Sequence, residues 1–333
     1  MADFSIGEAA GAGFRIIRRK PGAVMLWSAL VFVAIFLPVG LLLGTIVPAV
    51  MAVVREAAAN PDAEPPMNQF MTLYLRMMML QPLIMVGSLV LRAVLGAAVY
   101  RAVLTPEDDA WGYLRLGMRE LWVGATSIVI GIIVGFGIVG VMIPGAIIVA
   151  IASMTQNVWV IVPVAAVVVL AIVIALIWIS LRLSMAVPMS FDANEFRLFE
   201  SWEFTRGQGG KLFGLVALLI LYGIILELIV WVVFVAGAVG IALAFGITPE
   251  TLRALDGSQN PDLSIFTGPA LVAGILFSIL ISLIAGFAQA VFMAPFAEVY
   301  RQLRDSGART SSQPPYMPHL GEAAPASSQP PPA

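Results

Sequence analysis

The sequence predicts an all-α membrane protein, a polytopic bundle of six spanning helices. Of its 333 residues 60% are hydrophobic and 11% are charged, and the mean hydropathy is +0.97. A soluble domain of this length does not carry so much apolar sequence. A strand alone in lipid would leave its backbone unpaired, so each stretch with roughly 20 mainly apolar residues is expected to be a helix. Six stretches qualify: 24–50, 77–100, 121–152, 158–188, 212–245 and 270–296.

Basic residues indicate how these spans are oriented. A cluster directly precedes the first span, whose apolar run is too long for a cleavable signal, so we expect it to stay as an anchor. Thirteen of the eighteen Lys and Arg residues fall on the side of the two termini, whereas Arg55 and Arg253 lie in opposite loops. The positive-inside rule then predicts cytoplasmic termini. The excess of Arg over Lys is typical of a GC-rich bacterial genome, so we expect the bacterial inner (cytoplasmic) membrane.

Matches at a spacing near 100 residues predict an internal repeat. Arg15 and Arg19 recur as Arg115 and Arg119, and Tyr100-Arg101 recurs as Tyr300-Arg301. The membrane domain, 1–304, would then consist of three units, each a short inner helix followed by two spans: 4–104, 105–190 and 191–304. Capping-box patterns mark the expected starts of the inner helices: Ser5-x-x-Glu8, Thr105-x-x-Asp108 with Pro106 at the first helical position, and Asp192-x-x-Glu195.

Aromatic and basic residues alternate along these inner segments. This combination is typical of helices that lie in the headgroup layer, although the segments could also be ordinary cytoplasmic extensions of the spans. The candidate lipid-contacting residues are Arg15, Arg19, Arg115, Arg119, Trp111 and Trp202.

Small residues recur four apart in the odd-numbered spans. Such pairs let helix backbones approach closely in lipid, which here predicts packing among the three units or, alternatively, a homodimer. The pairs are Gly40 with Gly44, Gly131 with Gly135, and Ala236 with Gly240.

One acid, Glu227, interrupts the uncharged run 212–245. A carboxylate there must pair, protonate or face a cavity; its candidate partners are Arg92, Arg182 and Gln289. Three roles of Glu227 remain open: a buried hydrogen bond made by its neutral form, a headgroup or solute site, and proton coupling. Both arginines could instead extend toward the headgroups. We expect a neutral, hydrogen-bonded Glu227.

The residues for most enzyme chemistry are missing from the sequence. It has no Cys, and its one histidine, His319, lies in a Pro-rich segment, 305–333, that we expect to be a disordered tail. A metal site built on His and Cys, and a Ser-His-Asp or Cys-His arrangement, are therefore excluded. We predict no cofactor, no metal and no nucleic-acid partner. The tail could bind a protein partner through 313–318 or act only as a solubilising extension.

The capped inner segments, the basic junctions and the Tyr-Arg exits at 100–104 and 300–303 resemble bacterial six-span proteins similar to the membrane domain of glycerophosphodiester phosphodiesterases. The resemblance covers about residues 4–304. Hydrolysis in that family belongs to a separate soluble barrel, so the resemblance implies a shared membrane scaffold without the activity.

These observations favour a non-enzymatic inner-membrane protein that contacts lipids, anionic ones in particular, as a membrane-organising or accessory subunit. The alternative is a small solute or lipid transporter that uses Glu227 with an intramembrane arginine. An intramembrane enzyme acting on lipid is a third possibility.

Overall fold

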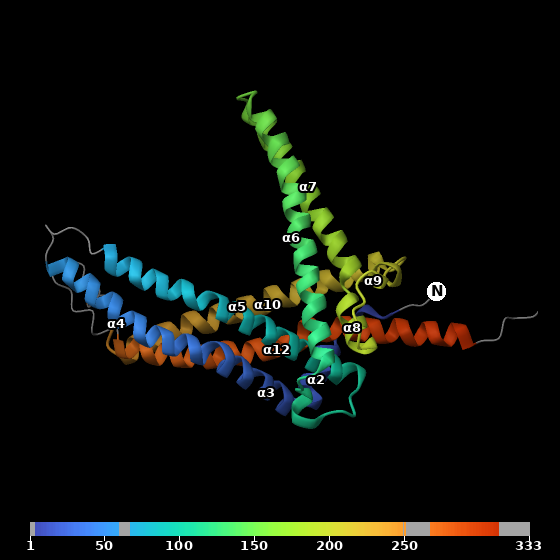
Figure 1. Ribbon diagram of the computed structural model, residues 1–333, viewed down its shortest axis with the longest axis horizontal. Helices are drawn as coiled ribbons and strands as arrows, with labels where there is room; N and C mark the ends of the chain where they lie inside the picture. Colours follow the sequence, from blue (N-terminus) through green and yellow to red (C-terminus); the bar gives the residue numbers. More distant parts are fainter. Residues whose placement is uncertain (1–3, 60–66, 249, 251–266, 313–333) are drawn as a thin grey trace, which may run out of the picture.

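A computed structural model describes residues 4–59, 67–248, 250 and 267–312 (Figure 1). Within these residues every regular element is helical and no strand occurs. Six of the helical stretches are long and apolar enough to cross a membrane. The chain is therefore an integral membrane protein with the predicted fold class. Arg253 and the tail from 313 onward, including His319, lie outside the described residues.

The first two spans are preceded by two short helices. The elements in chain order are α1 Ile6–Ala10, α2 Ala12–Arg19, α3 Pro21–Val31, the π-helical turn η1 Phe32–Phe36, α4 Leu37–Ala59 and α5 Met67–Leu104. The first span thus consists of α3, η1 and α4. Its π-helical turn lies just before Pro38, which has no N–H to donate to a regular α-helical ladder.

The remaining four spans alternate with short helices on one side. The long helices are α6 Met118–Ser153, α7 Val158–Leu183, α10 Gly209–Ala244 and α12 Thr267–Ser312. The short elements are the 3₁₀ turn η2 Ala110–Tyr113, α8 Ala186–Ala193 and α9 Glu200–Phe204. Helix α12 passes the predicted boundary at 304 and enters the segment expected to be tail.

The spans form two groups (Figure 1). The first span, α5, α10 and α12 run along the long axis, while α6 and α7 form an antiparallel hairpin that points away from them. The base of the hairpin packs against α5, where a Cβ built on Gly124 would lie 3.1 Å from the Ala93 methyl group. Farther out, a Cβ on Gly131, Gly135 or Gly140 would meet no neighbour within 4 Å.

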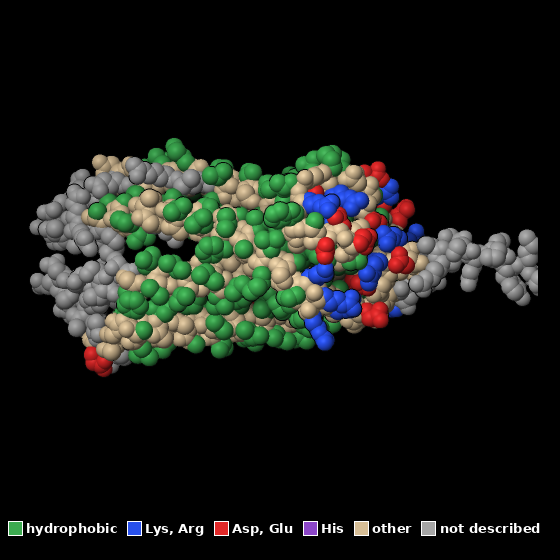
Figure 2. Space-filling view, turned by 90° about the horizontal axis from the view of Figure 1, so that it is seen from below, with side chains coloured by type: hydrophobic (Ala, Val, Ile, Leu, Met, Phe, Trp, Pro, Cys, Tyr) green, Lys and Arg blue, Asp and Glu red, His purple; other side chains and the backbone are tan. Residues whose placement is uncertain are grey.

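Charged side chains gather at one end of the molecule, and its flanks are mainly apolar (Figure 2). We call this end, formed by residues 4–20, 101–120, 190–206 and 297–306, the charged end. The buried core also lies toward it: Trp27 is fully buried there with Tyr113 and Phe191. The outer parts of the spans carry exposed apolar residues, as expected of surfaces in contact with lipid.

The closest helix crossings occur at glycines other than the predicted pairs. A Cβ on Gly13 of α2 would lie 2.4 Å from the Ala290 carbonyl oxygen of α12, and one on Gly286 would lie 2.1 Å from Ser28 Oγ. By contrast, the space around Gly40, Gly44, Gly131, Gly135 and Gly240 is open. The prediction that these residues pack the three units together is wrong, and the homodimer alternative stays a prediction.

Of the three predicted inner-helix starts, only the first forms. Ser5 Oγ accepts the Glu8 N–H at 3.4 Å. The second fails because tertiary contacts take the backbone carbonyls that a helix would use: Trp27 Nε1 donates to Gly112 O at 2.8 Å, and Arg101 donates to Tyr113 O. Residues 105–109 are turns and irregular backbone, with Pro106 in a turn.

The third inner helix also differs from the prediction. Asp192 lies in the last turn of α8, which ends at Asn194 in the left-handed conformation (φ 54°) that often terminates helices. Its carboxylate accepts hydrogen bonds from Tyr300 and Arg304 and so does not cap a helix start. Only the five-residue α9 remains of the expected amphipathic stretch, and the threefold repeat stays a prediction.

Candidate functional site

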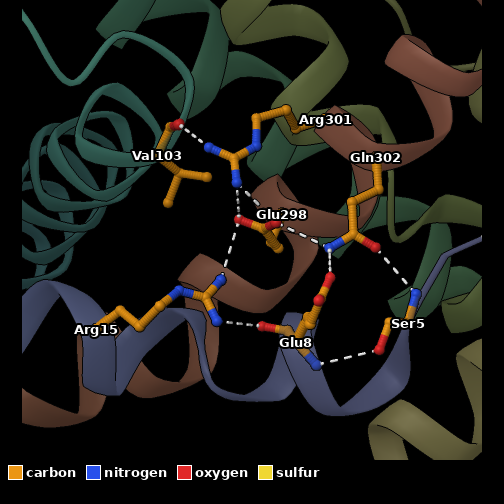
Figure 3. A network of polar contacts seen from close by, with 7 residues as sticks. All are labelled: Ser5, Glu8, Arg15, Val103, Glu298, Arg301 and Gln302. Atoms are coloured by element: carbon orange, nitrogen blue, oxygen red, sulfur yellow. Dashed lines mark hydrogen bonds and ion pairs between the residues drawn. The ribbon is translucent and has the colours of Figure 1, made fainter.

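Glu298 is the centre of a polar network at the charged end (Figure 3). It is 4% exposed. Its carboxylate accepts from Arg301 Nη2 at 2.8 and 2.7 Å and from Gln302 Nε2 at 2.8 Å, and it pairs with Arg15 Nη2 at 3.3 Å. Arg301 Nη1 also donates to the Val103 carbonyl at 3.3 Å. Two cations thereby neutralise this buried carboxylate. Arg301 lies one helical turn away on α12, and Arg15 comes from α2.

The same network attaches residues 5–15 to α12 (Figure 3). Ser5 N–H donates to Gln302 Oε1 at 2.9 Å, and Arg15 Nη1 donates to the Glu8 carbonyl at 2.8 Å. The Glu8 side chain accepts from Gln302 Nε2 at 3.4 Å. The Ser5–Glu8 capping box is thus only half formed, because Gln302 of α12 takes its second hydrogen bond.

A second buried ion pair joins the end of α5 to the start of α6. Arg101, 3% exposed, pairs with Glu120, 5% exposed, and its Nε lies 3.7 Å from Asp108 Oδ2. Its guanidinium also lies 5.5 Å from the centre of the Phe191 ring. Residues 105–117 are therefore held against α5 and α8 by a fully engaged arginine.

The Lys20–Asp109 pair closes this loop against the first span. Lys20 Nζ donates to Asp109 Oδ2 at 2.6 Å. The hydrogen bond and the charge of Lys20 lower the pKa of Asp109, and those of Asp109 raise the pKa of Lys20. Both side chains are about half exposed, so solvent screens the pair.

A pocket of about 240 Å³ lies between α2, the end of α5, the following loop and α12. We call it the basic pocket. Four cationic side chains and one carboxylate line it: Arg15, Arg19, Lys20, Arg301 and Glu298. Apolar side chains form the rest of its wall, among them Ile16 and Val103. This arrangement favours an anion.

The predicted intramembrane site is not assembled. Glu227 and Arg92 are exposed and Gln289 is half-buried, and within the described residues none of these side chains makes a hydrogen bond or ion pair. The predicted buried hydrogen bond of Glu227 is therefore wrong: Glu227 lies on the outward surface of α10, beside exposed Ile224 and Leu228.

Arg182 binds aromatic rings instead of Glu227. Its guanidinium lies 5.9 Å from the Trp178 ring centre and 5.7 Å from that of Trp202, and these two rings meet edge to face at 4.9 Å. Its Nη1 also donates to the Trp202 carbonyl at 3.5 Å. Trp202, predicted to contact lipid, is 40% exposed and forms part of this cation–π cluster.

The remaining predicted interfacial residues differ in their surroundings. Trp111 is 84% exposed. Arg115 pairs with Asp108, and Arg119 lies 5.4 Å from the Phe191 ring centre. Arg19 is exposed, and in the part of the chain that the structure describes its side chain has no hydrogen bond or ion pair. Arg19 and Trp111 are therefore the most available of the predicted lipid contacts.

The acids Glu120 and Glu298 were not predicted as site residues. The recurring Tyr-Arg pair pointed to the two arginines that bind them, Arg101 and Arg301. A signal for Glu298 existed: it lies one helical turn before Arg301, a spacing at which ion pairs form. No comparable local spacing links Glu120 to Arg101.

Comparison with family models, with curated proteins and with solved structures found no match to this chain. The resemblance to the phosphodiesterase membrane domain thus stays a prediction. Among the described residues, no group of three or more His, Cys, Asp or Glu side chains could hold a metal ion.

Proposed function

We propose that this protein is a non-enzymatic component of the bacterial inner membrane whose charged end faces the cytoplasm and binds anionic lipid headgroups. In this role it acts as a membrane-organising or accessory subunit. The observation that carries the proposal is the pair Arg18 and Arg19: both are exposed, and neither side chain has a hydrogen bond or ion pair within the described residues.

The position of these arginines supports a lipid ligand. The first span begins at Pro21, two residues after Arg19, which would put both guanidinium groups where the hydrocarbon gives way to headgroups. Each basic residue close to an anionic membrane surface contributes about 1 kcal/mol of attraction. The exposed Trp111 ring adds an aromatic anchor of the kind found at this depth.

Native mass spectrometry of the full-length protein tests the proposal. With equimolar phosphatidylglycerol and phosphatidylcholine in the micelle, the wild-type protein should retain mainly phosphatidylglycerol. An Arg18→Gln, Arg19→Gln double variant should lose most of this preference, because two unneutralised charges are removed without breaking an ion pair. Equal retention of both lipids by the wild-type protein would refute the proposal.

A further inference from the structure

The basic pocket contains one cation that no acidic side chain neutralises. Arg15 and Arg301 share Glu298, and Lys20 pairs with Asp109 at 2.6 Å. Arg19 also lines the pocket, and its exposed side chain has no ion pair among the described residues. The pocket therefore keeps excess positive charge after its internal pairs are counted.

The two paired arginines also retain hydrogen-bond donors. A guanidinium has five N–H groups. Arg15 and Arg301 engage only their Nη1 and Nη2 atoms within the described residues, and Glu298 holds both in place. Guanidinium groups match the geometry of phosphate oxygens. Two fixed guanidiniums and one free guanidinium thus surround the same small volume.

The depth of the pocket fits a phosphate at the membrane surface. Arg19 and Lys20 directly precede the span that begins at Pro21, and Val103 lies at the inner end of the span 70–104. The pocket therefore lies beside the ends of two spans, where a bilayer would present its phospholipid phosphates. Its apolar wall, including Ile16 and Val103, suits the uncharged part of such a ligand.

The neighbouring pocket provides an internal contrast. It measures about 710 Å³ and shares Glu298 and Arg301 with the basic pocket, but its other charged residues are the acids Glu8 and Asp305. Carboxylates repel a phosphate, so only one side of the Glu298–Arg301 pair suits an anion. The charge pattern changes sign across this ion pair.

We infer that the basic pocket binds one phosphate group, with Arg19 as its unpaired ligand and with Arg15 and Arg301 held in position by Glu298. An anionic phospholipid headgroup and a soluble phosphate share this chemistry. The inference rests on the proposed lipid-binding function and assigns it a defined site.

Isothermal titration of the full-length protein in neutral detergent tests the site, with short-chain phosphatidylglycerol and inorganic phosphate as probes. Saturable binding with one site per chain is expected. Arg19→Ala should weaken binding about tenfold or more, the usual effect of losing a charge-assisted hydrogen bond. Arg206→Ala removes the same charge from an exposed residue of the charged end that does not line the pocket, and should change the affinity less than about threefold.

The outcomes separate this inference from the proposed function. Binding of phosphatidylglycerol alone, with loss in Arg19→Ala only, identifies a lipid headgroup; equal binding of inorganic phosphate identifies a soluble source. Equal weakening by the two substitutions, or no saturable binding of either probe, would overturn the pocket. In that case the preference for anionic lipid in mass spectrometry would still support the proposed function.

Discussion

At the residue scale, three acids show that burial and ion pairing could not be predicted from the local sequence. Glu227 attracts attention because its own segment is apolar, yet it lies on the outward face of α10 without a hydrogen bond to the described residues. Glu120 and Glu298 lie at the boundary of polar segments, yet both are buried and paired with arginine. Local hydropathy reports where an acid is unusual, whereas burial depends on which distant segment covers it.

Glu227→Leu and Glu120→Leu should therefore have opposite consequences for stability. Glu227→Leu should leave the apparent Tm in detergent within about 2 °C of the wild-type value, because no hydrogen bond is lost. Glu120→Leu should lower it strongly, because removing one partner of a buried ion pair costs about 3–5 kcal/mol. Tryptophan fluorescence during heating measures both. A large loss in Glu227→Leu would reveal a stabilising contact for this carboxylate.

At the element scale, the spans were predictable and the segments between them were not. Each apolar run became a helix because lipid leaves the backbone no other partner, and this constraint acts on every residue of the run. The loop 105–117 instead follows contacts from Trp27 and Arg101, which take its carbonyls. No pattern within the loop encodes those partners, so its helix-like start was misleading.

The sequence also did not predict which glycines lie at close helix contacts, although it showed that the spans are rich in glycine. Spacing predicted that Gly40 and Gly44 would pack, whereas Gly13 and Gly286 make the tight crossings on α12. A small residue permits close approach but does not determine which helix comes near. That choice depends on how α12 packs against α2 and α3.

Gly13→Ala and Gly40→Ala provide a matched test of these crossings. At Gly13 the new methyl group would lie 2.4 Å from a backbone oxygen of α12, so α2 must move, and we expect a loss of about 1–3 kcal/mol. At Gly40 it would meet no atom within 4 Å, and stability should be unchanged or slightly higher. The apparent Tm of the two variants distinguishes these outcomes. Equal effects would contradict the observed crossing.

At the scale of the whole molecule, the Glu298 network connects the two ends of the described chain. Arg15 and Ser5 reach side chains of α12 that are almost 300 residues later in sequence. The N-terminal helices are therefore attached to the last span by polar contacts as well as by packing at Gly13. Their position depends on one buried carboxylate.

Glu298→Ala should loosen the N-terminal helices without unfolding the spans, because it leaves Arg15 and Arg301 without their common acceptor. Limited trypsin digestion in detergent should then cleave faster after Arg15, Arg18 or Arg19. Glu195→Ala is the control, since it removes an exposed pair with Arg197. N-terminal sequencing of the fragments locates the cleavage. The same N-terminal protection in both variants would show that packing alone holds these helices.

The hairpin of α6 and α7 has a consequence for the surrounding bilayer. Its base packs against α5 at the charged end, and its far end points away from the other four spans (Figure 1). In a bilayer crossed by the other four spans, the cross-section of the protein would therefore widen with distance from the charged end, and acyl chains would fill the space between the two groups. An inclusion of this shape displaces unequal areas of lipid in the two leaflets, so curvature of the membrane is energetically coupled to its presence.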